Sequence, residues 1–364
     1  MFNLDLHISV VGDLENEFEE RLAQLVRFSI SGHNHLVPNR PAISDPVAHV
    51  NQRTWVNLDP IRIRRFQNRY ERFLRTFDGF VVTHTPSFVE IFAPFDKPIL
   101  GVVSTRYEAP YTDQPEQWQR LNVLLTDMIK GGQLTLVANN RADGDYFQFF
   151  TGARIPVIPS LCEGKTRWSG ASRKRVTICR DDILRAKIGR QSSYEPIEAL
   201  GKPYEWQDLM DCLEVLVIPQ NVSTMTLFEL ATAGVPVAVP SQALLKKLKT
   251  EYPGVLGELT YAELKQIRVS DVSSSPINWE SDTYLDWWLE RADFYDLDLM
   301  PNVRVIDALD ELEVDDAYIY ERESRFRELV IARNNQIRAM RRDLFDRWLG
   351  LFPLSNSEHG SSTD

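Results

Sequence analysis

The chain has 364 residues, which is more than one hydrophobic core usually supports and fits two domains of ordinary size. Its net charge of −11, with 43% apolar residues, argues against a general nucleic-acid-binding protein, because such proteins need basic surface to displace counterions. The N-terminus lacks the basic start and long apolar centre of a signal peptide, and no apolar run is long enough to span a membrane. The three cysteines, which show no metal-ligand spacing, predict reduced thiols, so we expect a soluble protein of the cytoplasm.

Strand-like and helix-like segments alternate through the first half of the chain. This alternation is typical of a mainly parallel sheet covered by helices on both faces. The expected strands are 4–11, 79–83, 98–103, 134–138 and 155–159, and the expected helices are 14–28, 60–77, 115–130 and 143–150. We therefore predict a Rossmann-like first domain over residues 1–160.

A segment without periodicity, residues 160–174, is rich in small, polar and basic residues and indicates a connection between domains. A second α/β unit restarts with a strand at 175–179, and we predict a Rossmann-like second domain over residues 175–315.

The last part of the chain is helical. Residues 280–294 predict one helix, and 318–349 predict a long, arginine-rich amphipathic helix within a C-terminal unit over 316–353. That helix is long enough to cross back to the first domain. An alternative is weak contact of Arg341, Arg342 and the Trp348 end with a membrane surface. The tail, 354–364, is polar and is expected to be disordered.

Residues 213–241 predict a buried strand, a polar turn, a capped helix and a second buried strand. Ser223 is a residue type that caps helix N-termini, and the N–H groups of Thr224, Met225 and Thr226 would then point out of the helix start. An anion such as a diphosphate can bind at such a helix start.

Within this helix Thr226, Glu229 and Thr232 are three residues apart and form one polar stripe on an otherwise apolar helix. The distance along the helix from the proposed phosphate to Glu229 is about the length of a ribose attached to that phosphate. Gly234 is expected to end the helix as its C′ residue.

The run Glu229-Leu-Ala-Thr-Ala-Gly-Val-Pro236 resembles the donor-nucleotide segment of GT-B glycosyltransferases, where a carboxylate precedes small residues, glycine, any residue and proline. Many members carry a second carboxylate eight positions earlier, where this chain has Asn221. The resemblance implies two Rossmann-like domains facing a cleft, with a nucleotide sugar held by the second and a saccharide acceptor by the first. It implies sugar transfer to an acceptor hydroxyl in glycan, polysaccharide or glycoprotein assembly.

Glycosyl transfer needs positive charge on the leaving diphosphate and a group that accepts the acceptor's proton. The resembling family places basic residues after the first strand of the second domain, and Arg180 and Lys187 are the candidates there.

Polar residues follow the strands of the first half, where parallel strands would bring them to one edge. The candidate catalytic residues are His84, Glu108 and Asp13, with His84 favoured because it ends a strand and because the unperturbed pKa of an imidazole suits proton transfer near neutral pH. The candidate substrate-binding residues are His33, Arg106 and Asn139.

The acidic pairs at 143 and 145, 181 and 182, and 315 and 316 are interpreted as helix-start or surface charges, so we predict that no metal and no other cofactor is required. Two alternatives remain open: a nucleotide-sugar epimerase of the same fold, and a non-catalytic nucleotide- or sugar-binding module.

Overall fold

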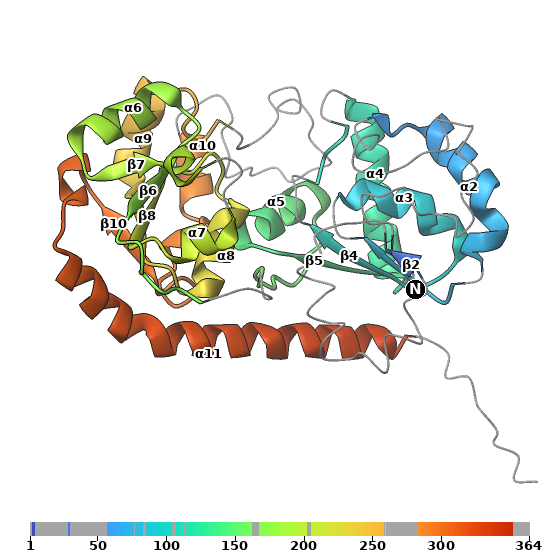
Figure 1. Ribbon diagram of the computed structural model, residues 1–364. Coiled ribbons are helices and arrows are strands. Elements are labelled where there is room, and N and C mark those ends of the chain that lie inside the picture. Colours follow the sequence, from blue (N-terminus) through green and yellow to red (C-terminus); the bar gives the residue numbers. More distant parts are fainter. Residues whose placement is uncertain are drawn as a thin grey trace, which may run out of the picture.

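The computed structural model describes residues 2–3, 28–29, 57–75, 77–82, 85–103, 107–111, 114–161, 167–201, 205–257, 259 and 283–351. The predicted strand at 4–11 and the tail at 354–364 lie outside these residues, and so does the predicted helix at 14–28 except for its last residue. The described part of the chain is a mixed α/β protein built on two parallel sheets (Figure 1).

The first sheet is formed by β1 (Phe2–Asn3), β2 (Phe28–Ser29), β3 (Phe80–Val82), β4 (Ile99–Val103) and β5 (Leu134–Ala138). Its strands lie in the order β2-β1-β3-β4-β5, all parallel. The predicted strand at 155–159 is reduced to one parallel bridge between Ala138 and Val157. The helices of this half are α2 (Pro60–Leu74), α3 (Val89–Phe92), α4 (Pro115–Lys130) and α5 (Arg141–Thr151).

The second sheet is formed by β6 (Arg175–Ile178), β7 (Tyr194–Pro196), β8 (Glu214–Val217), β9 (Val237–Pro240) and β10 (Val303–Ile306). Its order is β10-β9-β8-β6-β7, again all parallel. The helices of this half are α6 (Asp182–Gln191), α7 (Trp206–Met210), α8 (Met225–Ala233), α9 (Gln242–Glu251) and α10 (Thr283–Leu289).

The two sheets share one topology. If the described strands of each sheet are numbered along the chain, both sheets have the spatial order 2-1-3-4-5. In open parallel sheets of this kind, the direction of strand addition reverses between strands 1 and 3, and ligands bind beyond the carboxyl ends of the strands at that point. The reversal falls between β1 and β3 in the first sheet and between β6 and β8 in the second.

The long helix α11 (Asp316–Leu349) runs along both sheets (Figure 1). At its start, Asp316 accepts a hydrogen bond from Arg175 of β6. Its last turns pack against the first sheet, in a cluster that contains Val81, Leu100, Val102, Val137, Ile337, Leu344, Phe345 and Trp348. The helix therefore links the outer part of the second sheet to the first.

This packing corrects the alternative in which Arg341 and Trp348 touch a membrane. Trp348 is 1% exposed, and the buried Arg341 donates a hydrogen bond to the carbonyl of Leu161. Both side chains therefore make their contacts inside the protein. No helix in the described part of the chain is both long enough and apolar enough to cross a bilayer.

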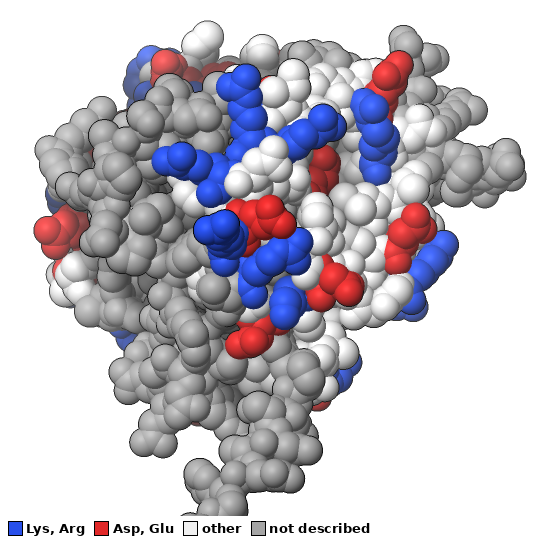
Figure 2. Space-filling model, turned by 90° about the vertical axis from the view of Figure 1, so that its right-hand side faces the viewer, with Lys and Arg blue, Asp and Glu red and all other residues white. Residues whose placement is uncertain are grey.

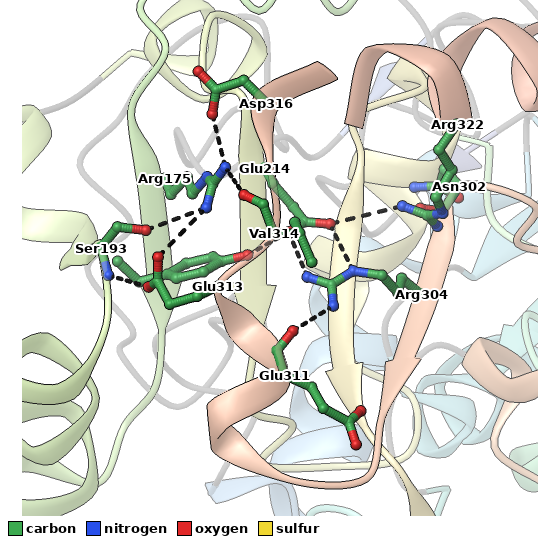
Figure 3. Close-up of polar contacts among 11 residues, drawn as sticks. Arg175, Ser193, Glu214, Asn302, Arg304, Glu311, Glu313, Val314, Asp316 and Arg322 are labelled. Atoms are coloured by element: carbon green, nitrogen blue, oxygen red, sulfur yellow. Dashed lines mark hydrogen bonds and ion pairs between the residues drawn. The ribbon is translucent and has the colours of Figure 1, made fainter. Parts of the chain in front are cut away.

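A buried ionic network lies at the amino ends of the second sheet, opposite the edge at which ligands are expected (Figure 3). Glu214, the first residue of β8, is completely buried and pairs with Arg304 at 2.8 Å and Arg322 at 3.7 Å. The Tyr194 hydroxyl also donates to this carboxylate. The network joins β7, β8, β10 and α11, so its role is to hold these elements together.

The end of α8 confirms that Gly234 is the C′ residue, because its φ of 74° lies in the left-handed region. Replacing Gly234 with alanine is expected to lower the free energy of unfolding by about 1 kcal/mol, since a Cβ makes this conformation unfavourable. Gly189 inside α6 has ordinary helical geometry, and an added Cβ would make only an ordinary van der Waals contact with the Tyr194 carbonyl oxygen at 3.7 Å, so Gly189→Ala should instead stabilise by about 0.5–1 kcal/mol. Urea denaturation of both variants checks the pair, and equal changes would contradict the explanation.

Candidate functional site

The carboxyl edge of the second sheet carries two connections at its reversal point. One follows β6 and contains Cys179 and Arg180, and the other follows β8 and leads through residues 218–224 into α8. The Ile218 N–H donates to the carbonyl of Ile178, so the two connections leave the sheet side by side. The segment singled out in the sequence thus lies where this topology places ligands.

The start of α8 differs by one residue from the prediction. Thr224, and not Ser223, is the N-cap, with an extended backbone at φ −64° and ψ 111°. Asn221 explains the shift, because its side-chain oxygen accepts from the N–H of Ser223 at 3.3 Å and its carbonyl accepts from the Thr224 hydroxyl at 2.8 Å. Asn221 therefore shapes the turn at the position where the resembling enzymes carry a carboxylate.

The predicted anion-binding amides are at this helix start. Among the described residues, the backbone N–H groups of Thr224, Met225 and Thr226 have no hydrogen-bond acceptor. Met225 also faces the first half of the chain, where its sulfur lies 3.5 Å from the Asn139 amide nitrogen and 3.7 Å from the Ser160 hydroxyl. The helix start is therefore half-buried between the two halves.

Glu229 occupies the partly exposed side of α8, together with Thr226 and Thr232, while Leu227, Phe228, Leu230 and Ala231 are buried. The Glu229 carboxylate makes no hydrogen bond or ion pair with any described residue. Burial of this unpaired group raises its pKa to about 7. A half-buried carboxylate without a protein partner can accept hydrogen bonds from the hydroxyls of a ligand.

The predicted phosphate-binding cations have different surroundings. Arg180 is exposed directly after β6, at the carboxyl edge. Lys187 lies inside α6, where its ammonium donates to the Tyr252 hydroxyl at 3.2 Å and lies over that ring. Of the two, Arg180 has the position that suits contact with a ligand beyond the strand ends.

In the first half, four of the predicted residues, Asp13, His33, His84 and Arg106, lie outside the described residues. Glu108 is completely buried, and its carboxylate accepts a hydrogen bond from the Tyr146 hydroxyl at 3.0 Å. Asn139 is also buried, with its carbonyl oxygen accepting from Asn140 and its amide against Met225. The structure therefore brings Asn139 to the α8 start but encloses Glu108 in the core.

Two of the three acidic pairs lie at helix starts, as predicted. Asp181 caps α6 and Asp315 caps α11, each by accepting backbone N–H groups. No group of three or more potential metal ligands of the His, Cys, Asp or Glu types is present in the described part of the chain.

The contacts that fix the two halves together were not predicted from the sequence. Arg333 of α11, only 4% exposed, donates to the Thr232 hydroxyl at 3.3 Å and to the carbonyl of Ser160 at 3.4 Å. A sequence signal existed, because Arg333 lies on the same helical stripe as the apolar positions Phe326, Val330 and Ile337.

A second contact joins α5 to α10 and the segment that follows it. Asp145 pairs with Arg291 at 2.8 Å, the rings of Tyr146 and Trp288 lie 5.1 Å apart, and the Asp293 carboxylate accepts from the Arg141 N–H at 3.3 Å. A cavity of about 550 Å³ lies beside Asp293, between α5, residues 154–159 and α11.

We expect Asp293 to make the stability of the protein depend on pH, because burial raises the pKa of its carboxyl group from 3.8 to about 7. The folded state then binds more protons than the unfolded state between these values, so this contribution is complete below about pH 4 and is lost as pH rises to 7. The slope is up to about 1.4 kcal/mol per pH unit. Asp293→Asn should therefore gain stability relative to the parent as pH rises from 4 to 7.5, as measured by urea denaturation. A difference independent of pH would contradict this.

No protein-family model and no curated protein matches the chain. Among solved structures, it is similar to one described as "Crystal Structure Analysis of the Glycotransferase of kitacinnamycin", with 12% identity, 95% of this chain and 96% of that chain covered, and a TM-score of 0.39. So distant a likeness assigns no activity.

Proposed function

We propose that this protein is a glycosyltransferase that takes a sugar from a nucleotide-diphosphate donor bound at the carboxyl edge of the second sheet. The observation that carries the proposal is Glu229, a half-buried carboxylate that has no partner among the described residues and lies on the helix that begins at the reversal point of the sheet. A group that costs free energy to bury is best explained by a ligand that it binds.

The α8 geometry suits a nucleotide diphosphate. The open N–H groups of Met225 and Thr226 would hold the diphosphate, and the exposed Arg180 would add positive charge. Glu229 lies four residues beyond Met225, about 6 Å along the helix axis, where it would accept hydrogen bonds from the ribose hydroxyls. The same positive groups would stabilise the leaving diphosphate as the glycosidic bond to the donor breaks.

The acceptor would be a saccharide held by the first half. His84 follows β3, which borders the reversal point of the first sheet, and it is the base that we propose removes the proton from the acceptor hydroxyl. Asp13, His33 and Arg106 are proposed to surround the acceptor. Glu108 is not included, since its carboxylate is enclosed in the core.

Calorimetric titration of the full chain with UDP, GDP, ADP and TDP tests the donor site. We expect one of these to bind with a dissociation constant in the micromolar range and to raise the melting temperature by mass action. The matching nucleotide sugars, with a panel of saccharide acceptors, then test transfer. If none of the four binds at millimolar concentration, the proposal is wrong. Interconversion of the donor sugar without transfer would instead identify an epimerase.

A further inference from the structure

Helix α2 is rich in arginine in a chain whose net charge is −11. Its sequence, PIRIRRFQNRYERFL, contains five arginines, at 62, 64, 65, 69 and 72, and Arg75 follows the helix directly. The single acidic residue of the helix is Glu71. The opposite side of α2 is apolar and buried in the first core through Ile63, Phe66, Tyr70 and Leu74.

The exposed arginines of this helix lack acidic partners among the described residues. Arg64, Arg65, Arg69 and Arg72 are exposed, and none of them makes an ion pair or a side-chain hydrogen bond within the described part of the chain. Arg75 differs, because it pairs with Glu71 at 3.0 Å. Arg65 and Arg69 are four residues apart, and Arg69 and Arg72 three apart, so like charges face each other along the helix and destabilise it slightly. Bound anions would remove this repulsion.

Helix α2 lies at one end of the molecule (Figure 1). Figure 2 shows this end, where basic side chains gather over the described surface with fewer acidic ones beside them. Arg65 and Arg72 are about 10 Å apart along the helix axis. Ile61, which is 65% exposed, lies one turn before Arg65 on the same row.

We propose that the face formed by Ile61, Arg64, Arg65, Arg69 and Arg72 docks on an anionic lipid bilayer. Guanidinium groups bind phosphate oxygens in pairs of hydrogen bonds, so lipid phosphates fit these side chains. Ile61 would enter the headgroup region beside them.

The charge distribution favours a bilayer over a nucleic acid. The exposed side of α2 carries several arginines and the helix contains one acidic residue, Glu71, while charges more than about 10 Å away are largely screened at 0.1 M salt. A nucleic acid long enough to reach past the helix would meet the rest of a protein with net charge −11.

Co-sedimentation of the full chain with vesicles tests this proposal. We expect binding to phosphatidylcholine vesicles that contain 30% phosphatidylglycerol and none to phosphatidylcholine alone, with weaker binding at higher salt. Each arginine near an anionic surface contributes a factor of about five, so Arg65→Gln with Arg69→Gln should weaken binding about 25-fold. Unchanged melting temperature would show that the variant is folded.

Two matched variants separate this face from net charge. Arg325→Gln with Arg347→Gln removes the same charge from α11, where both arginines are exposed and paired, and should leave vesicle binding unchanged. Glu71→Gln releases Arg75 and should strengthen binding several-fold. Equal losses in the α2 and α11 variants, or no binding to the anionic vesicles, would overturn the proposal. So would tight binding of an RNA or DNA oligonucleotide that depends on Arg65 and Arg69 while vesicles do not bind.

Discussion

Replacing Glu229 with glutamine is expected to weaken nucleotide binding at least about 100-fold while the protein stays folded. Hydrogen bonds to a charged group contribute about 1.5–3 kcal/mol each, and the proposed ribose contact includes two of them. Stability should stay the same or rise above pH 7, because the variant removes the cost of burying an unpaired charge. Calorimetry with the preferred nucleotide and urea denaturation of the same samples measure both effects.

The pH dependence of binding distinguishes Glu229 from a general loss of the site. Because its pKa is about 7 in the free protein, the carboxyl group loses its proton as pH rises from 6 to 8, and the charged form, which accepts the ribose hydrogen bonds, becomes the main one. Affinity should therefore increase over this interval in the parent, and this part of the increase should be absent in Glu229→Gln. Glu195→Gln, on the exposed middle residue of β7, is the control and should bind as the parent does. Parent-like affinity in Glu229→Gln would refute the donor site.

The second large effect is expected at Glu214. Its replacement with alanine leaves Arg304 and Arg322, which are both largely buried, without their carboxylate, and it also removes the acceptor of the Tyr194 hydroxyl. Removing one partner of a buried ion pair costs about 3–5 kcal/mol, because the remaining charge stays desolvated. Urea denaturation should show this loss of unfolding free energy.

Glu313 offers a comparison within the same region. Its carboxylate lies 3.9 Å from Arg175 and its side chain is 51% exposed, so the ion pair is screened by water. Glu313→Ala should cost about 1 kcal/mol or less, including the loss of its contact with the Ser193 N–H. Similar losses in the two variants would show that burial does not determine the strength of this network.

The function of the network follows from where it lies. It is at the amino ends of β6, β7 and β8, and the proposed donor site is at their carboxyl ends. Glu214→Ala is therefore expected to lower stability without changing the affinity of the remaining folded protein for a nucleotide. The Glu229 and Glu214 variants thus distinguish a residue that binds a ligand from one that stabilises the fold.

Local patterns in the sequence determined much of the secondary structure. The strand at 134–138 and the helix at 115–130 have the predicted bounds, and Gly234 ends α8 as expected. The side of α8 that carries Thr226, Glu229 and Thr232 was also predicted, because helical periodicity and capping depend on residues close together in the chain.

Only the tertiary structure decided which polar residues are enclosed. Glu108 and Glu214 look alike in sequence, as single carboxylates beside buried strands, yet their partners come from α5, β10 and α11. The same holds for Arg333 and Arg341, whose positions on α11 reveal an inward direction but not the carbonyls of Ser160 and Leu161 that receive them. Whether a charge is exposed, paired or left for a ligand depends on atoms brought together from distant parts of the chain, and packing alone sets that arrangement.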